Sequence, residues 1–205
     1  MTASDPVRAV VFDLGGVLID WDPFEAVAAG VGRDEARRFL DEFDFPSWNH
    51  RLDAGRSIDD AEAEVAATYP RWLPHVRSYR THFEDSLRGT HPETVELLSR
   101  LHSRAVPLYA LTNWPAELFP PARVRFDFLA LFTDIVVSGE VRLAKPDPRI
   151  FDVLRDRVPV PPERCLFVDD APANVAAAGA AGLDAVTFTD AAALEAVLLD
   201  RGLLG

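Results

Sequence analysis

The sequence predicts an α/β fold in which a doubly wound parallel sheet carries an all-helical insertion after its first strand. Short apolar runs recur along the chain, and amphipathic segments of helical length separate them. Residues 20–88 break this alternation, because they contain helical patterns only. Strands that alternate with helices are typical of parallel sheets that carry helices on both faces.

The expected strands are short segments in which nearly every residue is apolar. Parallel strands that are covered on both faces have this continuous apolar character, whereas half-exposed strands alternate between apolar and polar residues. The segments are residues 7–14, 106–111, 133–138, 165–168 and 184–188.

Helices are expected between and after these strands, at residues 91–104, 148–157, 172–181 and 191–201. Two of them have recognisable start signals. Thr90 and Glu93 have the spacing of a capping box. Asp147 is placed to act as an N-cap, and Pro148 then takes the first helical position.

The insertion shows helical periodicity in two places. One set of apolar residues has the spacing i, i+3, i+4, i+7 and consists of Ala36, Phe39, Leu40 and Phe43. Residues 58–69 give a second amphipathic stretch. We therefore expect residues 1–19 and 89–205 to form the sheet domain and residues 20–88 to form a separate helical domain.

Composition excludes several classes of partner. The chain has 205 residues, with 21 basic and 33 acidic side chains and a net charge of −12. Nucleic acids and anionic membranes bind basic surfaces, so we expect neither as a partner. No apolar stretch approaches the roughly 20 residues of a membrane span. The chain shows no signal-peptide pattern at its start. Its single cysteine, Cys165, is typical of a protein in a reducing compartment. We therefore expect the chain in the cytoplasm.

Polar side chains follow four of the predicted strands. In chain order they are Asp13, Thr112 with Asn113, Lys145, and Asp169 with Asp170. Each has an ordinary alternative explanation as a turn, loop or helix-cap residue. The carboxyl ends of parallel strands, however, lie along one edge of the sheet, where α/β proteins place their sites. As a set, these side chains therefore predict an active site.

Such a set of groups can transfer a phosphoryl group. Crowded carboxylates repel one another unless a cation lies among them, and Mg²⁺ prefers oxygen ligands. Asp13 could bind the metal through one carboxylate oxygen and attack phosphorus with the other, giving an aspartyl-phosphate. The groups that can hold the phosphoryl oxygens are the Thr112 hydroxyl, the Asn113 amide, the Lys145 ammonium and the backbone N–H groups of Leu14 and Gly15.

Together these motifs resemble those of the haloacid dehalogenase superfamily, chiefly its phosphatase branch, which has a helical cap and includes sugar-phosphate phosphatases. The matching segments are Phe12-Asp13-Leu14-Gly15-Gly16-Val17, Leu111-Thr112-Asn113, Lys145-Pro146-Asp147-Pro148 with Ile150-Phe151, and Phe167-Val168-Asp169-Asp170 with Asn174. The resemblance implies a Rossmann-like core, a Mg²⁺ site and an aspartyl-phosphate route, and the insertion looks like the helical cap.

The resemblance also implies roles for single residues. Asp13 would be the nucleophile and a metal ligand, and the Gly15 carbonyl would be a second ligand. Asp170 would be the principal acidic ligand of the last motif, and Asp169 another ligand or an orienting residue.

One position departs from the family pattern. Many family phosphatases have a second aspartate two residues after the nucleophile, where it protonates the leaving group and later activates water, but this chain has Gly15 there. Three explanations are open: slow turnover, a replacement acid such as Asp20 or Asp22, or a leaving group that needs little protonation. General acid catalysis contributes about 10²–10⁴-fold, so its loss would slow the reaction without abolishing it.

The insertion should select the substrate, because the core contacts only the phosphate. The predicted specificity residues are Trp21, Trp48, Arg51 and Trp114, with Asn49 and His50 beside them. A sugar ring can lie on an indole, and Arg51 could bind a second anionic group. The alternative is that the tryptophans pack the insertion against the core.

The favoured function is therefore Mg²⁺-dependent hydrolysis of a small phosphorylated metabolite, such as a sugar phosphate, by a monomer or homodimer. A metal-independent 2-haloacid dehalogenase is an alternative, although the adjacent acids Asp169 and Asp170 are a poor place to release halide. A phospho-acceptor receiver domain is another alternative. Its acidic pair comes first in the chain, however, whereas Asp169 and Asp170 come last here, and it lacks the insertion. Because of Gly15, a non-catalytic module that binds a phosphorylated ligand is a further alternative.

Overall fold

The structure, a computed structural model, describes residues 7–205. The expected absence of a signal peptide concerns residues 1–8, of which residues 1–6 lie outside the described residues. Within the described part, no helix is both long and apolar enough to cross a membrane.

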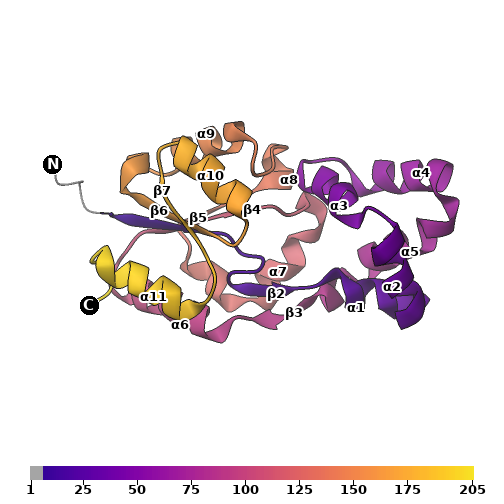
Figure 1. Cartoon of the computed structure of the whole chain (residues 1–205), viewed down its shortest axis with the longest axis horizontal. Helices are drawn as coiled ribbons and strands as arrows, with labels where there is room; N and C mark the ends of the chain where they lie inside the picture. Colours follow the sequence, from indigo (N-terminus) through magenta and orange to yellow (C-terminus); the bar gives the residue numbers. More distant parts are fainter. Residues whose placement is uncertain (1–6) are drawn as a thin grey trace.

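A parallel sheet forms the centre of the larger part of the molecule (Figure 1). Its strands are β1 (Ala9–Phe12), β4 (Leu108–Thr112), β5 (Asp134–Val137), β6 (Cys165–Asp169) and β7 (Asp184–Thr187). They run in the order β5-β4-β1-β6-β7, and all pairs are parallel. All five predicted strands are thus confirmed. Because β1 lies between β4 and β6, the three strands that precede Asp13, Asn113 and Asp170 are neighbours.

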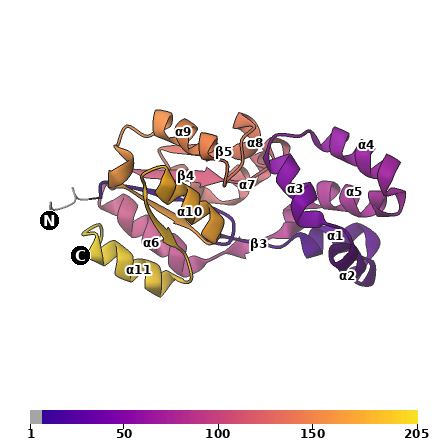
Figure 2. The ribbon, with the colours of Figure 1, turned by 45° about the horizontal axis from the view of Figure 1, so that its top comes forward.

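Helices cover both faces of the sheet (Figures 1 and 2). They are α6 (Pro92–Ser103) and α11 (Ala191–Asp200) on one face, and α9 (Pro148–Arg157) and α10 (Pro172–Ala180) on the other. Val10 of β1 belongs to the apolar cluster that includes α6 and α11 residues, whereas Val11 belongs to the cluster of α9 and α10. Burial on both faces explains why the strands are continuously apolar.

The remaining core elements are short. They are α7 (Pro120–Arg125), α8 (Ser138–Val141) and the 3₁₀ turns η3 (Ala116–Leu118), η4 (Asp127–Leu131) and η5 (Pro162–Arg164). Gly139 of α8 lies so close to the loop after β4 that an added Cβ would be 2.4 Å from the Ala116 nitrogen. This close approach brings α8 against the segment that follows Asn113.

The insertion is helical through most of its length and lies at one end of the molecule (Figure 2). It contains α1 (Pro23–Val31), α2 (Arg33–Glu42), α3 (Phe45–Asp53), α4 (Ile58–Thr68) and α5 (Leu73–Thr81), with turns η1 (Pro70–Trp72) and η2 (Phe83–Ser86). Its interior is aromatic: Phe39 stacks on Phe43 and contacts Phe45 and Trp72 edge-on. The two predicted amphipathic stretches correspond to α2 and α4 and are confirmed.

The expectation of helices alone in residues 20–88 is wrong at both edges of the insertion. β2 (Ile19–Trp21) pairs antiparallel with β3 (Leu87–Thr90), so Asp20, Trp21, Leu87 and Arg88 belong to a two-stranded ribbon. The chain enters the helical insertion through β2 and leaves it through β3 (Figure 1). The division into a sheet domain and a helical domain stays a prediction.

Candidate active site

Asp13 lies directly after β1 and has partners on both carboxylate oxygens. Its Oδ1 accepts a 2.7 Å hydrogen bond from the Leu14 N–H, and its Oδ2 lies 3.0 Å from the Lys145 Nζ. The Asp13 N–H donates to the Val168 carbonyl at 2.8 Å, which ties the residue to β6. The backbone of β1 and β6 therefore fixes this carboxylate at the sheet edge. The Leu14 N–H, predicted to hold phosphate, is used by Asp13.

Lys145 is a buried cation shared by two carboxylates. Its Nζ donates to Asp169 Oδ2 at 2.6 Å and to the Leu111 carbonyl at 2.8 Å, while also facing Asp13. Asn113 fixes the Lys145 backbone, because its Oδ1 accepts from the Lys145 N–H at 2.8 Å and its Nδ2 donates to the Lys145 carbonyl at 2.9 Å. Both polar atoms of the Asn113 amide, predicted to hold phosphate, thus position Lys145.

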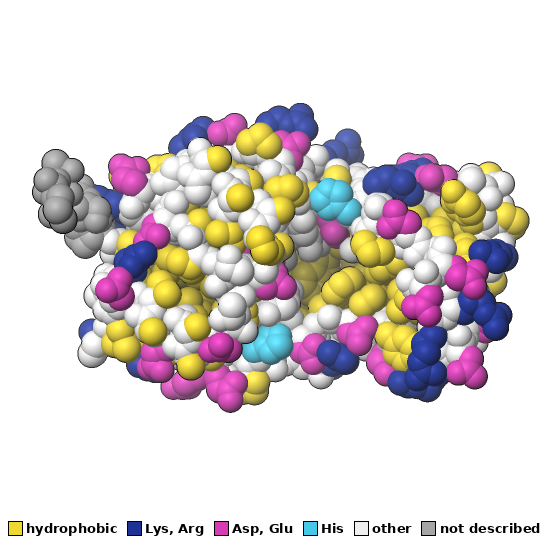
Figure 3. All heavy atoms as spheres, viewed as in Figure 1, with side chains coloured by type: hydrophobic (Ala, Val, Ile, Leu, Met, Phe, Trp, Pro, Cys, Tyr) yellow, Lys and Arg dark blue, Asp and Glu magenta, His cyan; other side chains and the backbone are white. Residues whose placement is uncertain are grey.

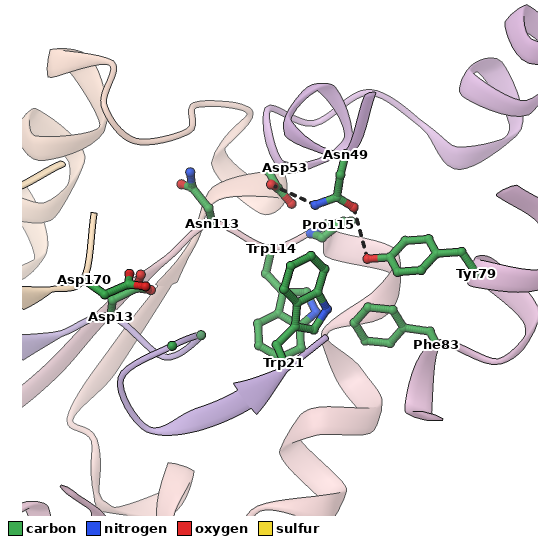
Figure 4. Close-up of a pocket in the computed structure, with 12 residues that line it drawn as sticks. Asp13, Trp21, Asn49, Asp53, Tyr79, Phe83, Asn113, Trp114, Pro115 and Asp170 are labelled. Atoms are coloured by element: carbon green, nitrogen blue, oxygen red, sulfur yellow. Dashed lines mark hydrogen bonds between the residues drawn. The ribbon is translucent and has the colours of Figure 1, made fainter. Parts of the chain in front are cut away.

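Asp169 and Asp170 complete an acidic cluster with Asp13. One carboxylate oxygen from each of the three residues lies within 4.8 Å of the other two. Asp169 is fully buried and accepts hydrogen bonds from Lys145, from the Asn174 amide at 3.0 and 3.1 Å, and from the Ala171 N–H at 2.9 Å. Asp170 is more exposed and faces the same space as Asp13 (Figure 4). These contacts give Asp169 the surroundings of an orienting residue.

The surroundings of Asp13 and Asp170 raise the pKa of both carboxyl groups. Burial raises the pKa of Asp13 to about 7; Lys145 opposes this rise, and the Asp169 charge adds to it. Burial and the Asp169 charge also raise the pKa of Asp170. A bound cation would relieve this repulsion, and the all-oxygen donor set is of the kind that Mg²⁺ prefers. The residues present therefore fit a divalent metal.

A pocket of about 300 Å³ opens between the sheet edge and the insertion. Figure 3 shows the surface hollowed at this place, with hydrophobic side chains in the hollow. The pocket is lined by Asp13, Gly15, Gly16, Trp21, Asn49, Asp53, Tyr79, Phe83, Asn113, Trp114, Pro115 and Asp170. Asp13 and Asp170 lie together at its sheet end, whereas the aromatic rings and Asp53 lie toward the insertion (Figure 4). Thr112 is buried at the end of β4 and is not part of this lining.

The predicted specificity residues divide into two groups. Trp21 and Trp114 line the pocket, as does Asn49. Trp48 is buried in the aromatic interior of the insertion, where it packs on Phe45 and Tyr79 of the insertion itself rather than on the core. Arg51 pairs with Glu64 at 3.4 Å and lies outside the pocket lining, as does His50.

The two candidate replacement acids do not reach the pocket. Arg88 bonds to Asp20 Oδ1 at 2.7 Å and to Asp22 Oδ2 at 3.0 Å, and neither aspartate lines the pocket. Asp22 also caps α1 through the Phe24 N–H. Their proximity in sequence to Asp13 does not bring them to its side.

Sequence reasoning missed three lining residues of the insertion: Asp53, Tyr79 and Phe83. They come from α3, α5 and η2, where no strand end marks a site residue. In the sequence, the one signal was that Asp53 follows Trp48 by five residues in the same predicted helical region.

Comparison with known proteins agrees with this geometry. The family model of haloacid dehalogenase-like hydrolases matches residues 7–182. A phosphoglycolate phosphatase of Pseudomonas fluorescens is 30% identical over 197 residues, covering 89% of this chain and 69% of that protein. A phosphorylated carbohydrates phosphatase of Thermotoga maritima is 28% identical over 192 residues, covering 88% and 84%. The structure of a haloacid dehalogenase family enzyme from Bacteroides thetaiotaomicron, in complex with magnesium and inorganic phosphate, matches with a TM-score of 0.70 at 19% identity, covering 90% and 95%.

The parallel sheet and these matches define a hydrolase with a mixed α/β fold. The chain belongs to the haloacid dehalogenase-like hydrolase family, and the curated relatives place it in the phosphatase branch. The resemblance of the four motifs is thereby confirmed. The same matches favour an enzyme over a non-catalytic binding module.

Proposed function

We propose that the protein hydrolyses small phosphomonoesters through an aspartyl-phosphate formed on Asp13, with Mg²⁺ as cofactor. The observation that supports this most directly is the convergence of separate chain segments on Asp13. Lys145 lies 3.0 Å from its Oδ2, and Asp169 and Asp170 each place an oxygen within 4.8 Å of the Asp13 carboxylate. A nucleophilic carboxylate, a charge-neutralising lysine and a divalent-metal donor set are the groups that phosphoryl transfer needs.

Each group has a task in this proposal. Asp13 Oδ2, held by Lys145, attacks phosphorus, and the ester oxygen leaves from the opposite side. Asp13, Asp170 and the Gly15 carbonyl would hold Mg²⁺, while Asp169 keeps Lys145 in position. When bound, the metal supplies positive charge that stabilises the phosphoryl oxygens. We choose Mg²⁺ because the Bacteroides thetaiotaomicron enzyme of the same fold binds magnesium together with inorganic phosphate.

A sugar phosphate is the substrate class that we favour. Trp21 and Trp114 present aromatic rings beside the acidic end of the pocket (Figure 4). Aromatic rings bind the apolar faces of sugars while neighbouring polar groups bind the hydroxyls. The volume of about 300 Å³ suits a small metabolite. The named activity of the Thermotoga maritima relative, on phosphorylated carbohydrates, supports the same choice. The cytoplasmic location and the monomeric or homodimeric state stay predictions.

The test is phosphate release from a panel of phosphorylated metabolites. Asp13→Asn should abolish release, because an amide is not a nucleophile toward phosphorus, and EDTA should silence the unmodified protein. The matched control is Asp34→Asn, whose carboxylate is 96% exposed on α2 and should leave turnover unchanged. Turnover that survives in Asp13→Asn would refute the nucleophile assignment, and an unchanged rate in EDTA would refute the metal.

A further inference from the structure

Asp53 is a buried acid of the insertion that the reaction described above does not use. It ends α3 and lines the pocket on the side away from Asp13 and Asp170 (Figure 4). The residue is 6% exposed. Its Oδ2 accepts a 3.3 Å hydrogen bond from the Asn49 Nδ2, and its Oδ1 is buried without a hydrogen-bond partner. A buried carboxylate oxygen without a partner is rare in proteins and needs a reason.

Two neighbours hold the Asp53 carboxyl in this orientation. The Tyr79 hydroxyl donates to Asn49 Oδ1 at 3.0 Å, and this bond turns the amide nitrogen of Asn49 toward Asp53. Burial, followed by the Asp53 charge, raises the pKa of Tyr79 well above its usual value, so the hydroxyl stays a donor. The chain of hydrogen bonds reaches Oδ2 and leaves Oδ1 without a partner.

The surroundings of Asp53 favour its protonated form. Burial is the largest cause and the charge of Asp13 the second; together they raise the pKa of Asp53 to about 7, against the opposing effects of Lys145 and Asn49. An acid is most effective in proton transfer when its pKa lies near the working pH. Asp53 can therefore hold a proton near neutral pH and also release it.

The other pocket acids are assigned to different tasks. Within residues 7–205, the carboxyl groups that line the pocket belong to Asp13, Asp53 and Asp170. Asp13 and Asp170 belong to the acidic cluster that a cation would hold. At the position where many phosphatases of this family have their second acid, this chain has Gly15. Asp53 is thus the pocket carboxyl that is free to exchange a proton.

We propose that Asp53 is the proton donor and acceptor of this phosphatase, supplied by the insertion in place of the acid missing at Gly15. The inference rests on the proposed function. As Asp13 forms its bond to phosphorus, the bond from phosphorus to the ester oxygen breaks, and the Asp53 proton passes to that oxygen to give an alcohol. The Asp53 carboxylate then takes a proton from the water that attacks the aspartyl-phosphate, which releases phosphate and restores both side chains.

Leaving groups of different basicity separate this role from a structural one. Asp53→Asn keeps the size of the side chain and removes the exchangeable proton. With an alkyl phosphate, such as a hexose phosphate, turnover should fall by about 10²–10⁴-fold, the usual contribution of general acid and base catalysis. With p-nitrophenyl phosphate the nitrophenolate leaves without a proton. The variant should therefore release one equivalent of nitrophenolate at close to the rate of the unmodified protein and then stall as the phosphoenzyme.

The outcomes are distinguishable. If Asp53→Asn slows the first chemical step equally with the alkyl phosphate and with p-nitrophenyl phosphate, Asp53 is a structural residue. If it slows neither, Asp53 takes no part in the reaction. Either result overturns the inference. An unmodified protein that hydrolyses neither substrate would instead refute the proposed function. Asp34→Asn is the matched control, because it makes the same change at an exposed acid of the insertion.

A second variant tests the replacement directly. A Cβ added at Gly15 meets no atom within 4 Å, and Gly15 does not have the left-handed backbone that disfavours other residues. Gly15→Asp in the Asp53→Asn background should therefore restore the usual acid and regain at least about tenfold in alkyl-phosphate turnover, a small part of what general acid catalysis can supply. A double variant no more active than Asp53→Asn would count against proton exchange by Asp53.

Discussion

Gly16 shows how one residue without a side chain shapes the acidic cluster. Its φ is +72°, a backbone conformation that favours glycine, and an added Cβ would lie 2.5 Å from Asp170 Oδ2. The glycine thus permits both the turn after Asp13 and the position of the Asp170 carboxylate. Its neighbour Gly15 has neither constraint.

Gly16→Ala should therefore displace Asp170 and reduce activity. A misplacement of about 1 Å in a catalytic group can cost about 10²-fold in rate, and we expect a loss of that order in kcat/KM for phosphate release. Gly179→Ala on α10 is the control, because an added Cβ there meets no atom within 4 Å. Equal activity of the two variants would show that the Asp170 position tolerates displacement.

Single residues were predictable from the sequence where a strand end marked them. Asp13, Lys145 and Asp169 follow apolar strands, and the structure brings both carboxylates within ion-pair distance of Lys145. Trp48 and Asp53 both lie on α3, but the Trp48 ring is buried in the aromatic interior, whereas Asp53 lines the pocket. Sequence periodicity marks a buried face but does not say whether that face meets a core or a pocket.

At the scale of elements, one of the two predicted helix start signals is confirmed and the other is wrong. Asp147 caps α9 by accepting from the Arg149 N–H at 2.9 Å, and α9 has the predicted bounds 148–157. The capping box at Thr90 is wrong, because Thr90 pairs with Ile19 in the β2–β3 ribbon and His91 precedes α6. The ribbon strands β2 and β3 have only three and four residues, which is too short for a strand pattern to stand out in the sequence.

The packing of α5 against α2 introduces a buried histidine into the insertion. His75 stacks on Phe39 with ring centroids 5.1 Å apart and meets Trp72 edge-on at 4.9 Å. Burial lowers the pKa of His75, and Glu35, whose Oε2 lies 3.7 Å from Nε2, opposes this effect only in part. The folded chain therefore disfavours the protonated ring.

His75 should make stability depend on pH in a definite direction. Below the unfolded pKa of about 6.5, the unfolded chain binds a proton at this ring before the folded chain does, so unfolding becomes easier as pH falls. His75→Phe removes this contribution. Urea unfolding between pH 7.5 and pH 5 should show the unmodified protein losing stability relative to the variant, by at most about 1.4 kcal/mol per pH unit below pH 6.5. Parallel pH profiles would contradict the buried, neutral histidine.

Over the whole molecule, the pocket exists only because the insertion and the sheet edge meet. The Ile58 N–H at the start of α4 donates to Glu117 Oε1 of the core at 3.1 Å, and Gly55 lies against Arg142, with an added Cβ 2.6 Å from the Arg142 side chain. These contacts place α3 over the sheet edge. The acidic cluster comes from core strands, whereas Asp53 and Tyr79 come from the insertion. The pocket is thus lined by residues of both parts.

The acidic cluster should couple metal binding to the stability of the whole chain. Asp13, Asp169 and Asp170 repel one another, with Lys145 as a shared counter-charge, so a cation that binds the folded state should stabilise it. At about 100 times its dissociation constant, a ligand adds about 2.7 kcal/mol. For a chain of this size that corresponds to about 5–10 °C in Tm.

The measurement is thermal unfolding with MgCl₂ against KCl at equal ionic strength. Asp170→Asn should abolish the Mg²⁺-dependent rise in Tm, because it removes the acidic ligand that is not already held by Lys145 or Asn174. Asp34→Asn makes the same change in net charge far from the cluster and should keep the full rise. An equal rise in all three proteins would mean that Mg²⁺ only screens the net charge of −12, and the metal would then have no site at the sheet edge.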